Sequence, residues 1–413
     1  MNSALPAIRA IEIVPVKEGD EQLFCLYDPL GYVDEQIVLS PAALLIASSL
    51  DGVRDIGAIQ KELAAHLNGM VVKPEIIANV VNYLDENGFL LSERFFSIRD
   101  AVEARYQLER DRPPFHAGKA YPANPDELRA LIDSYFLLEG GPGPLSDISV
   151  PQNGSPALCV IAPHIDFTRG AVAYAHSYAS LYRRKKPETV LLFGVAHNCV
   201  PPPFILSRKN FATPFGVLET NQRVVNILEE ACDWNPLEYE FVQRTEHSIE
   251  FQAVMLSYLY GESVRIVPVL CSPFSEGHAE KNPARIPKVQ RFLEASQQLL
   301  REHSDTITVI AGADLAHVGL QFGDDFEIDD DIIEAVARRD REDLGQLVHQ
   351  PAESFYASVL SDNNSRRVCG LGCIYAAMKV VEPLAKSQQL LHYGYAPDPM
   401  GGIVSFAGMH IER

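Results

Sequence analysis

The sequence predicts an α/β protein with a central, mainly parallel sheet covered by helices, preceded by a small α+β domain. Two patterns predict this fold. After residue 156, apolar runs rich in β-branched residues alternate with helical segments, which is typical of strands buried on both faces. These runs are Ala157–Ala162, Thr189–Val195, Val264–Cys271 and Thr306–Ala311. Before residue 100, short strands are followed by three short helices, which indicates a separate domain.

The elements of the first domain can be assigned in order. Strands are expected at Ile11–Val16, Gln22–Leu26 and Gln36–Leu39, and helices at 41–50, 56–67 and 74–86. Ser40 is a good cap for the first helix and Pro41 a good first residue, while Asn87-Gly88 ends the third helix. Phe89-Leu90-Leu91 is expected to form a closing strand. The pattern predicts a winged-helix-like module over residues 1–96.

This module carries a first resemblance. The segments LSPAALLIASSLDGVRDIGAIQKEL and VVNYLDENGFL resemble the PqqD-like peptide-recognition domains over roughly residues 20–95. The resemblance implies a peptide or protein partner, and a scaffold or docking role is the alternative. Binding to DNA is disfavoured because residues 1–100 hold 7 Lys or Arg against 15 Asp or Glu, a net charge of −8.

A charged, helix-compatible segment at 97–112 is interpreted as a linker, so the second domain is expected at 113–413. Its first helix is expected at Pro125–Phe136, before a Gly/Pro-rich loop that ends near residue 156. Two late strands, Leu390–Tyr395 and Gly402–Gly408, are expected at an edge of the sheet or antiparallel to it.

Net charge, the length of the apolar stretches and the distribution of cysteines disfavour several classes of function. The 413 residues carry a net charge of −20, which repels polyanions and disfavours both nucleic acid and an anionic membrane surface. No apolar stretch approaches the roughly 20 residues of a spanning helix and the first residues lack the pattern of a signal peptide, so we expect a cytoplasmic protein. Seven spread cysteines do not form a disulfide framework.

Histidines follow three of the apolar runs. His164 comes after the first run, His197 after the second, and Asp314 with His317 after the fourth. In open α/β sheets ligands bind beyond the carboxyl ends of the strands. A single histidine there is more often a packing residue, but three at equivalent positions indicate a metal site or a general base.

Two further groups carry possible chemistry. The segment Thr245–Glu250 contains Glu246 and His247 where a loop becomes a helix; alternatively, Ser248 or Thr245 caps this helix and His247 lies on the surface. Cys369 stands at an expected helix start, where a thiol should have a lowered pKa, so it is a better candidate ligand or nucleophile than the neighbouring cysteine at 373.

A second resemblance covers about residues 113–410. The blocks FHAGKAYPANPDELRALI, APHIDFTRGAVAYAHSY, LLFGVAHN, TPFGVLETN, TEHSIEFQ, VRIVPVLC, GADLAHVG and RRVCGLGCIYA resemble the Memo family, in the same order. Memo proteins are similar in fold to the class III extradiol dioxygenases, in which two histidines and a carboxylate hold iron(II). The resemblance also implies a radical S-adenosylmethionine enzyme and a third system protein as partners.

The resemblance implies a set of metal ligands. Matched residue by residue, His164, His197 and Cys369 would bind the metal. This set is softer than two histidines and a carboxylate, so iron(II) or copper(I) is expected as cofactor, with zinc as a further possibility. The chain has Asn198 where the family commonly has a second histidine, and Leu371-Gly372-Cys373 where it has Arg-His-Pro, which leaves the substrate open.

The same resemblance implies polar residues beside the metal. Asp314 and His317 match one polar pair of the family, and Glu246 and His247 match its E-H-S motif. If unliganded, His317 or His247 could act as general acid or base toward a substrate, with a carboxylate such as Asp314 holding the imidazole tautomer. These four residues are therefore the candidate catalytic residues.

Two functional hypotheses follow. The first is a redox metalloenzyme with oxygenase-like or radical-handling activity in a multiprotein modification system. The second is a non-catalytic adaptor or delivery protein for copper or iron, whose N-terminal module docks a peptide or a partner.

Overall fold

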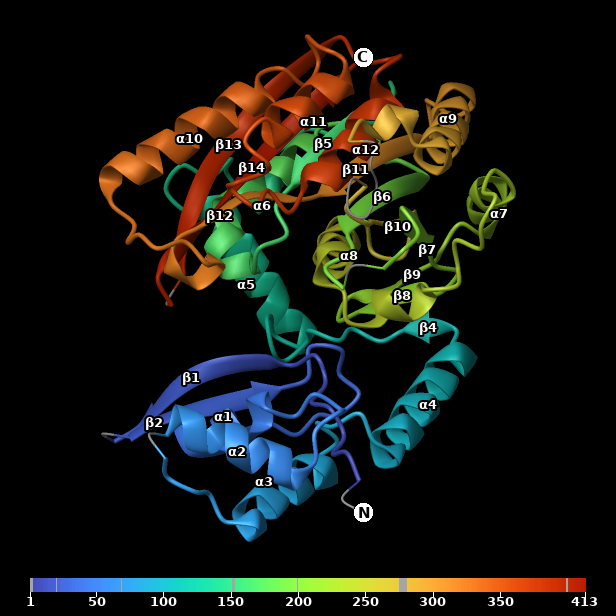
Figure 1. Ribbon diagram of the computed structural model, residues 1–413. Coiled ribbons are helices and arrows are strands. Elements are labelled where there is room, and N and C mark those ends of the chain that lie inside the picture. The colour runs from blue at the N-terminus through green and yellow to red at the C-terminus, as the bar shows by residue number, and fades with distance from the viewer. Residues whose placement is uncertain are drawn as a thin grey trace. The chain divides into compact units, whose positions relative to one another are not determined.

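The structure is a computed structural model that describes residues 3–19, 21–67, 69–150, 153–198, 200–274, 281–398 and 400–413. The chain divides into two compact units, Met1–Glu109 and Arg110–Arg413 (Figure 1). Among the described residues, none of the helices combines the length and the apolarity needed to cross a bilayer.

The first unit contains an antiparallel sheet in the order β1-β2-β3 and four helices. The strands are β1 (Glu12–Glu18), β2 (Glu21–Tyr27) and β3 (Ile37–Leu39), and the helices are α1 (Pro41–Ser48), α2 (Ile56–His66), α3 (Pro74–Glu86) and α4 (Glu93–Leu108). Ser40 accepts a hydrogen bond from the backbone of Ala43, so it caps α1 as expected. Leu26, Ile59 and Ile77 lie in one core shared by the sheet and the helices.

One expectation for this region differs from the structure. The closing strand at Phe89–Leu91 is wrong in extent: only an isolated bridge joins Leu90 to Ile8. The backbone N–H of Phe89 instead donates to Leu84 and closes the end of α3. The segment 97–112, expected to be helix-compatible, is mostly helical. It contains the end of α4, which continues to Leu108, and its last two residues form β4 (Asp111–Arg112).

The second unit is built on an eight-stranded mixed sheet in the order β12-β14-β5-β11-β6-β10-β7, with β13 paired to β14. The strands are β5 (Cys159–Ala162), β6 (Thr189–Val195), β7 (Phe204–Leu206), β10 (Arg265–Cys271), β11 (Ile307–Gly312), β12 (Asp314–Val318), β13 (Ser387–Asp398) and β14 (Gly402–Glu412). The strands β5, β11, β6 and β10 are parallel neighbours. The α/β expectation is confirmed, and β14 lies inside the sheet between β5 and β13.

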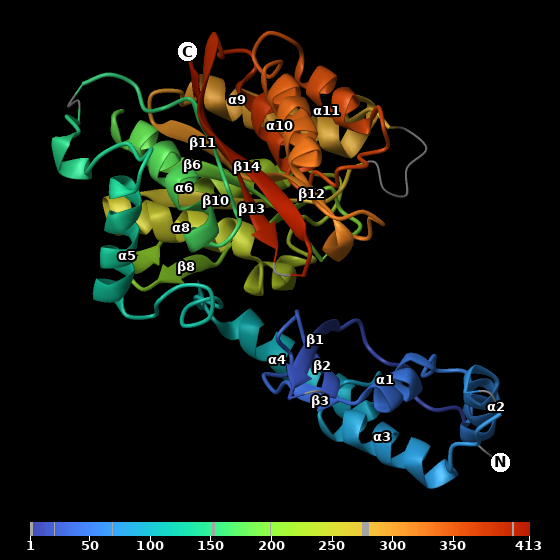
Figure 2. The ribbon, with the colours of Figure 1, turned by 90° about the vertical axis from the view of Figure 1, so that its left-hand side faces the viewer.

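Helices cover both faces of this sheet (Figure 2). Alternate residues of β6 show why: Val190 and Leu192 lie in one apolar cluster with α6 and α8, whereas Leu191 and Phe193 lie in another with α9 and α12. The helices are α5 (Pro125–Leu137), α6 (Phe167–Tyr182), α7 (Gln222–Glu230), α8 (His247–Tyr260), α9 (Pro287–Glu302), α10 (Asp330–Leu344), α11 (Ala352–Leu360) and α12 (Leu371–Val381). A small sheet joins β4 to β8 (Asn210–Thr213) and β9 (Gly216–Leu218).

Candidate metal centre

The carboxyl ends of three parallel strands bring the sequence-predicted residues to one edge of the sheet. Ala162 of β5 pairs with Gly312 of β11, and β11 pairs with β6 on its other side. His164, His197 and Asp314 each follow two residues after the end of one of these strands. Adjacent parallel strands end together, so their side chains share one site.

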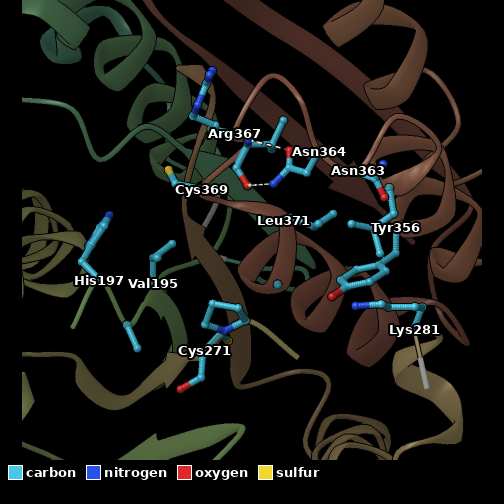
Figure 3. A pocket seen from close by; sticks show the side chains of 16 residues that line it. Val195, His197, Cys271, Lys281, Tyr356, Asn363, Asn364, Arg367, Cys369 and Leu371 are labelled. Carbon is cyan, nitrogen blue, oxygen red and sulfur yellow. Dashed lines mark hydrogen bonds between the residues drawn. The ribbon is translucent and has the colours of Figure 1, made fainter. Parts of the chain in front are cut away.

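His164, His197 and Cys369 form a group whose ligand atoms all lie within 4.8 Å of one another. The Cys369 Sγ is 3.3 Å from the His164 Nε2, and the two imidazole centroids are 5.1 Å apart. Figure 3 shows His197 and Cys369 at the same end of a cavity. Two imidazoles and a thiol at this spacing are a donor set that a single transition-metal ion could join.

Both imidazoles are oriented by a hydrogen bond from the nitrogen that faces away from the thiol. The Nδ1 of His164 donates to the carbonyl of Gly312 at 2.9 Å, and the Nδ1 of His197 lies 3.0 Å from the Glu246 carboxylate. In each ring the Nε2 is left to bind a metal, which is the usual arrangement of a ligating histidine and its carbonyl or carboxylate partner.

Glu246 reaches His197 because α8 begins unusually close to the sheet. A Cβ on Gly194 would lie 2.6 Å from the Ser248 hydroxyl, and one on Gly312 would lie 2.5 Å from the Ser248 carbonyl. The alternative in which Ser248 or Thr245 caps α8 is wrong. Glu246 is the capping residue, while the Ser248 hydroxyl bonds to the backbone of Val195.

A second group, His197, Glu246 and His247, also has ligand atoms within 4.8 Å of one another. Its carboxylate is already engaged, because the Glu246 oxygens accept from the backbone N–H groups of His197 and Ser248 as well as from the His197 ring. The 3.0 Å approach of ring nitrogen to oxygen is a normal hydrogen-bond length. Glu246 is therefore better suited to orient His197 than to bind a metal.

We expect Glu246→Gln to weaken metal binding about 10–100-fold without abolishing it, because loss of a carboxylate behind a ligating histidine has this typical effect. Competition with a chelator of known affinity measures the change. Glu262→Gln, a carboxylate in the loop between α8 and β10, is the control and should leave the affinity unchanged. Equal affinities of wild type and Glu246→Gln would contradict this role.

The electrostatics of the group differ from the sequence expectation at one point. Burial raises the pKa of the Cys369 thiol, contrary to the lowering expected at a helix start. The reason is that α12 begins only at Leu371, with Gly370 as its cap, so the half-buried thiol lies before the helix. Burial lowers the pKa of His164 to about 3, which keeps its ring neutral and able to bind a metal.

Asp314 and His317 reach the same site through an irregularity in β12. Residues three apart in a strand normally face opposite sides. Here Asp314 pairs with Phe406 and His317 with Val404, so one extra residue bulges out between them and both line one cavity. Asp314 accepts from the His164 backbone N–H at 2.9 Å, and burial raises its pKa to about 6.

Two cavities meet at the metal-ligand group. The first, here called the histidine cavity, has a volume of about 410 Å³ and is lined by His116, His164, His197, His247, Asp314 and His317. The second, here called the apolar cavity, has a volume of about 630 Å³ and includes Val195, His197, Tyr356, Leu360, Cys369 and Leu371 (Figure 3). His197 lines both cavities, so a ligand in either one could approach the group.

The four candidate catalytic residues all lie at this site. The His247 ring stacks on the His197 ring with centroids 4.6 Å apart and is about one-third exposed. His116, which received no role from the sequence, joins them in the histidine cavity. The only signal for it was its motif FHAGKAY, because the residue lies 131 positions before the start of α8 and nothing local shows that the two segments meet.

Together the fold and the site define an α/β protein with a candidate metal centre of two imidazoles and a thiol at the carboxyl edge of its sheet. The family model described as "Memo-like protein" matches residues 112–410, so the chain belongs to the Memo family. The family resemblance of the sequence is thereby confirmed.

Curated relatives extend this match. The chain is 30% identical over 408 residues to a MEMO1 family protein of Aquifex aeolicus, covering 98% of this chain and 99% of the relative. It is 26% identical to a MEMO1 family protein of Desulfurococcus amylolyticus, over 73% of this chain and 98% of that relative. A Thermus thermophilus relative is 25% identical over 82% of this chain and 93% of its own length. The Aquifex match is long enough to include the N-terminal unit.

Proposed function

We propose that this chain is a redox metalloenzyme whose metal is held by His164, His197 and Cys369. The observation that carries the proposal is the meeting of these three ligand atoms within 4.8 Å, although they come from separate parts of the chain. The hydrogen bonds that orient the two imidazoles support the same proposal, because they leave the Nε2 of each ring on the side of the thiol.

The donor set favours particular metals. Thiolate and imidazole ligands suit copper(I), iron(II) and zinc, whereas magnesium and calcium prefer oxygen ligands. When bound, iron or copper would supply redox chemistry and a Lewis acid at this point. We propose iron(II) or copper(I) as the resident metal, with zinc as the redox-inactive possibility.

The surrounding residues would handle protons. Asp314, with its pKa raised by burial to about 6, can hold or release a proton close to neutral pH. Burial lowers the pKa of His317, so this imidazole is neutral and can accept a proton from a substrate. His247 lines the same cavity and could do the same, and Glu246 orients His197.

Metal affinity should rise with pH. A thiol must lose its proton to bind a metal, and burial raises the pKa of Cys369 above its ordinary value. Between pH 6 and 8 most of the thiol is protonated. Against the lowering effect of burial, the Glu246 carboxylate raises the pKa of His197 well above its ordinary value. Metal binding therefore releases a proton from each of these two ligands and should tighten by more than about tenfold for each pH unit. Chelator competition over this range tests the expectation, and a flat profile would contradict thiolate ligation.

The alternative function is a non-catalytic copper or iron adaptor. Its support is that the chain has a further compact unit, which we propose to be a winged-helix, PqqD-like module that docks a peptide or a partner such as a radical S-adenosylmethionine enzyme. Turnover separates the two functions. Catalytic consumption of oxygen or of an added substrate by the metal-loaded chain supports the enzyme, whereas stoichiometric metal transfer to a partner without turnover supports the adaptor.

A further inference from the structure

His116 lies in the histidine cavity but has no part in the metal-ligand group. It comes from the loop between β4 and α5, and its ring packs edge-on against His247 and Phe251, with centroids 5.9 and 5.7 Å away. His116 is distant in the sequence from the other histidines that line this cavity. Its position among them indicates a role beyond packing.

The loop that carries His116 is fixed by one buried carboxylate. Glu250 of α8 is fully buried and accepts the backbone N–H groups of Phe115 and His116, at 3.1 and 2.8 Å. It also accepts the Tyr121 hydroxyl at 2.5 Å and pairs with the buried Arg112 at 2.7 Å. Four partners on one side chain hold the His116 backbone rigidly, which is how a binding residue is preorganised.

The hydrogen bond of the His116 ring determines which nitrogen is free. Its Nε2 lies 2.9 Å from the Thr245 carbonyl oxygen, which can only accept, so the Nε2 carries the proton. Burial lowers the pKa of His116, so the ring is neutral and its Nδ1 has a free lone pair. Within the part of the chain that the structure describes, no hydrogen bond is formed by this Nδ1.

His317 lines the same cavity, and among the described residues its Nε2 also forms no hydrogen bond. Its Nδ1 lies 3.2 Å from the Leu315 carbonyl, so the Nε2 of its neutral ring is the acceptor. The Asp314 carboxylate adds further acceptor oxygens. The cationic side chain in the cavity wall, Arg169, is already paired with Asp166. The cavity therefore offers mainly hydrogen-bond acceptors to a ligand.

We propose that His116 contacts the substrate, and that His116 and His317 together select a small molecule with at least two hydroxyl or amino donors. The assignment rests on the proposed function, because it places this molecule beside the metal. Hydroxyl or amino groups of such a molecule can donate hydrogen bonds to the His116 Nδ1 and the His317 Nε2. A molecule of the same shape that offers only acceptors would leave both nitrogens without a partner and should bind more weakly.

The test uses the metal-loaded full chain and 1,3-dihydroxybenzene, whose two hydroxyls are too far apart to chelate one metal ion. Calorimetry should show binding that is about tenfold or more weaker for 1,3-dimethoxybenzene, which lacks the donors. Equal binding of the dihydroxy and dimethoxy probes would overturn the proposal.

Two variants isolate His116. His116→Gln can keep a donor to Thr245 but lacks the Nδ1 acceptor, whereas His116→Asn places an amide oxygen near the Nδ1 position. We expect His116→Gln to weaken binding of the dihydroxy probe about tenfold, with unchanged metal content and melting temperature. His116→Asn should weaken this binding less. A purely structural His116 predicts the reverse order. Wild-type protein that fails to take up metal contradicts the proposed function. Metal-loaded protein that does not bind the dihydroxy probe contradicts only this inference.

Discussion

Replacement of Cys369 by alanine is expected to remove most of the bound metal while leaving the secondary structure intact. The thiol is the only sulfur among the three ligand atoms, and it lies 3.3 Å from the His164 Nε2. Without it, two imidazoles remain, and a soft or borderline metal loses its strongest ligand. Metal analysis of protein purified without oxygen measures the loss, with circular dichroism as the check on folding. His164→Ala and His197→Ala should have the same effect.

Cys373→Ala is the matched control for Cys369→Ala. The Cys373 thiol is fully buried in α12 and contacts the carbonyls of Phe193 and Gly312 at 3.3 and 3.7 Å, but it is not one of the grouped ligand atoms. Its loss should cost some stability but no metal. Full metal occupancy in Cys369→Ala, or metal loss in Cys373→Ala, would show that the ligand assignment is wrong and would favour a carboxylate such as Asp314 or Glu246 as third ligand.

Replacement of Arg112 by methionine should destabilise the second unit by about 3–5 kcal/mol, the usual cost of breaking a buried ion pair on one side. Arg112 is fully buried, pairs with Glu250 and donates to the carbonyls of Gln243 and Glu246. Its removal leaves the Glu250 carboxylate buried without a counter-charge. Urea unfolding followed by fluorescence measures the effect, because the single tryptophan, Trp234, belongs to this unit.

The double variant Arg112→Met with Glu250→Gln should recover part of the lost stability, because the unpaired charge is then gone.

The Arg112–Glu250 pair should also affect the stability of a fragment that begins at residue 113, the domain boundary predicted from the sequence. Such a fragment lacks Arg112 and should be less stable than one that begins at Arg110, where the second unit starts. Equal stability of the two fragments would contradict the importance of this pair.

The sequence predicted the strand ends well because continuous apolar runs are local signals. The runs before His164 and His197 became β5 and β6 of a mainly parallel sheet, as expected, whereas the place of β11 between them was not predicted. The prediction that Asp314 and His317 would share the site was also local, but the bulge that lets both face one cavity depends on pairing with β14, which lies almost 90 residues later.

The features that the sequence missed depend on contacts between distant segments. From the sequence, Arg112 was interpreted as part of a charged linker, because the buried Glu250 that neutralises it is more than 130 residues away. The lowered thiol pKa expected for Cys369 assumed a helix start, whereas burial by the surrounding strands and loops raises it. Neither the burial of a charge nor the desolvation of a thiol can be deduced from local spacing.

X-ray absorption spectroscopy at the metal edge, on wild-type protein purified without oxygen, tests the central claim most directly. The account predicts close to one equivalent of iron, copper or zinc, bound by two nitrogen ligands and one sulfur ligand. For zinc the sulfur should lie at about 2.3 Å and the nitrogens at about 2.0–2.1 Å. A metal surrounded only by oxygen and nitrogen, or protein that takes up no metal at all, would contradict a centre formed by His164, His197 and Cys369.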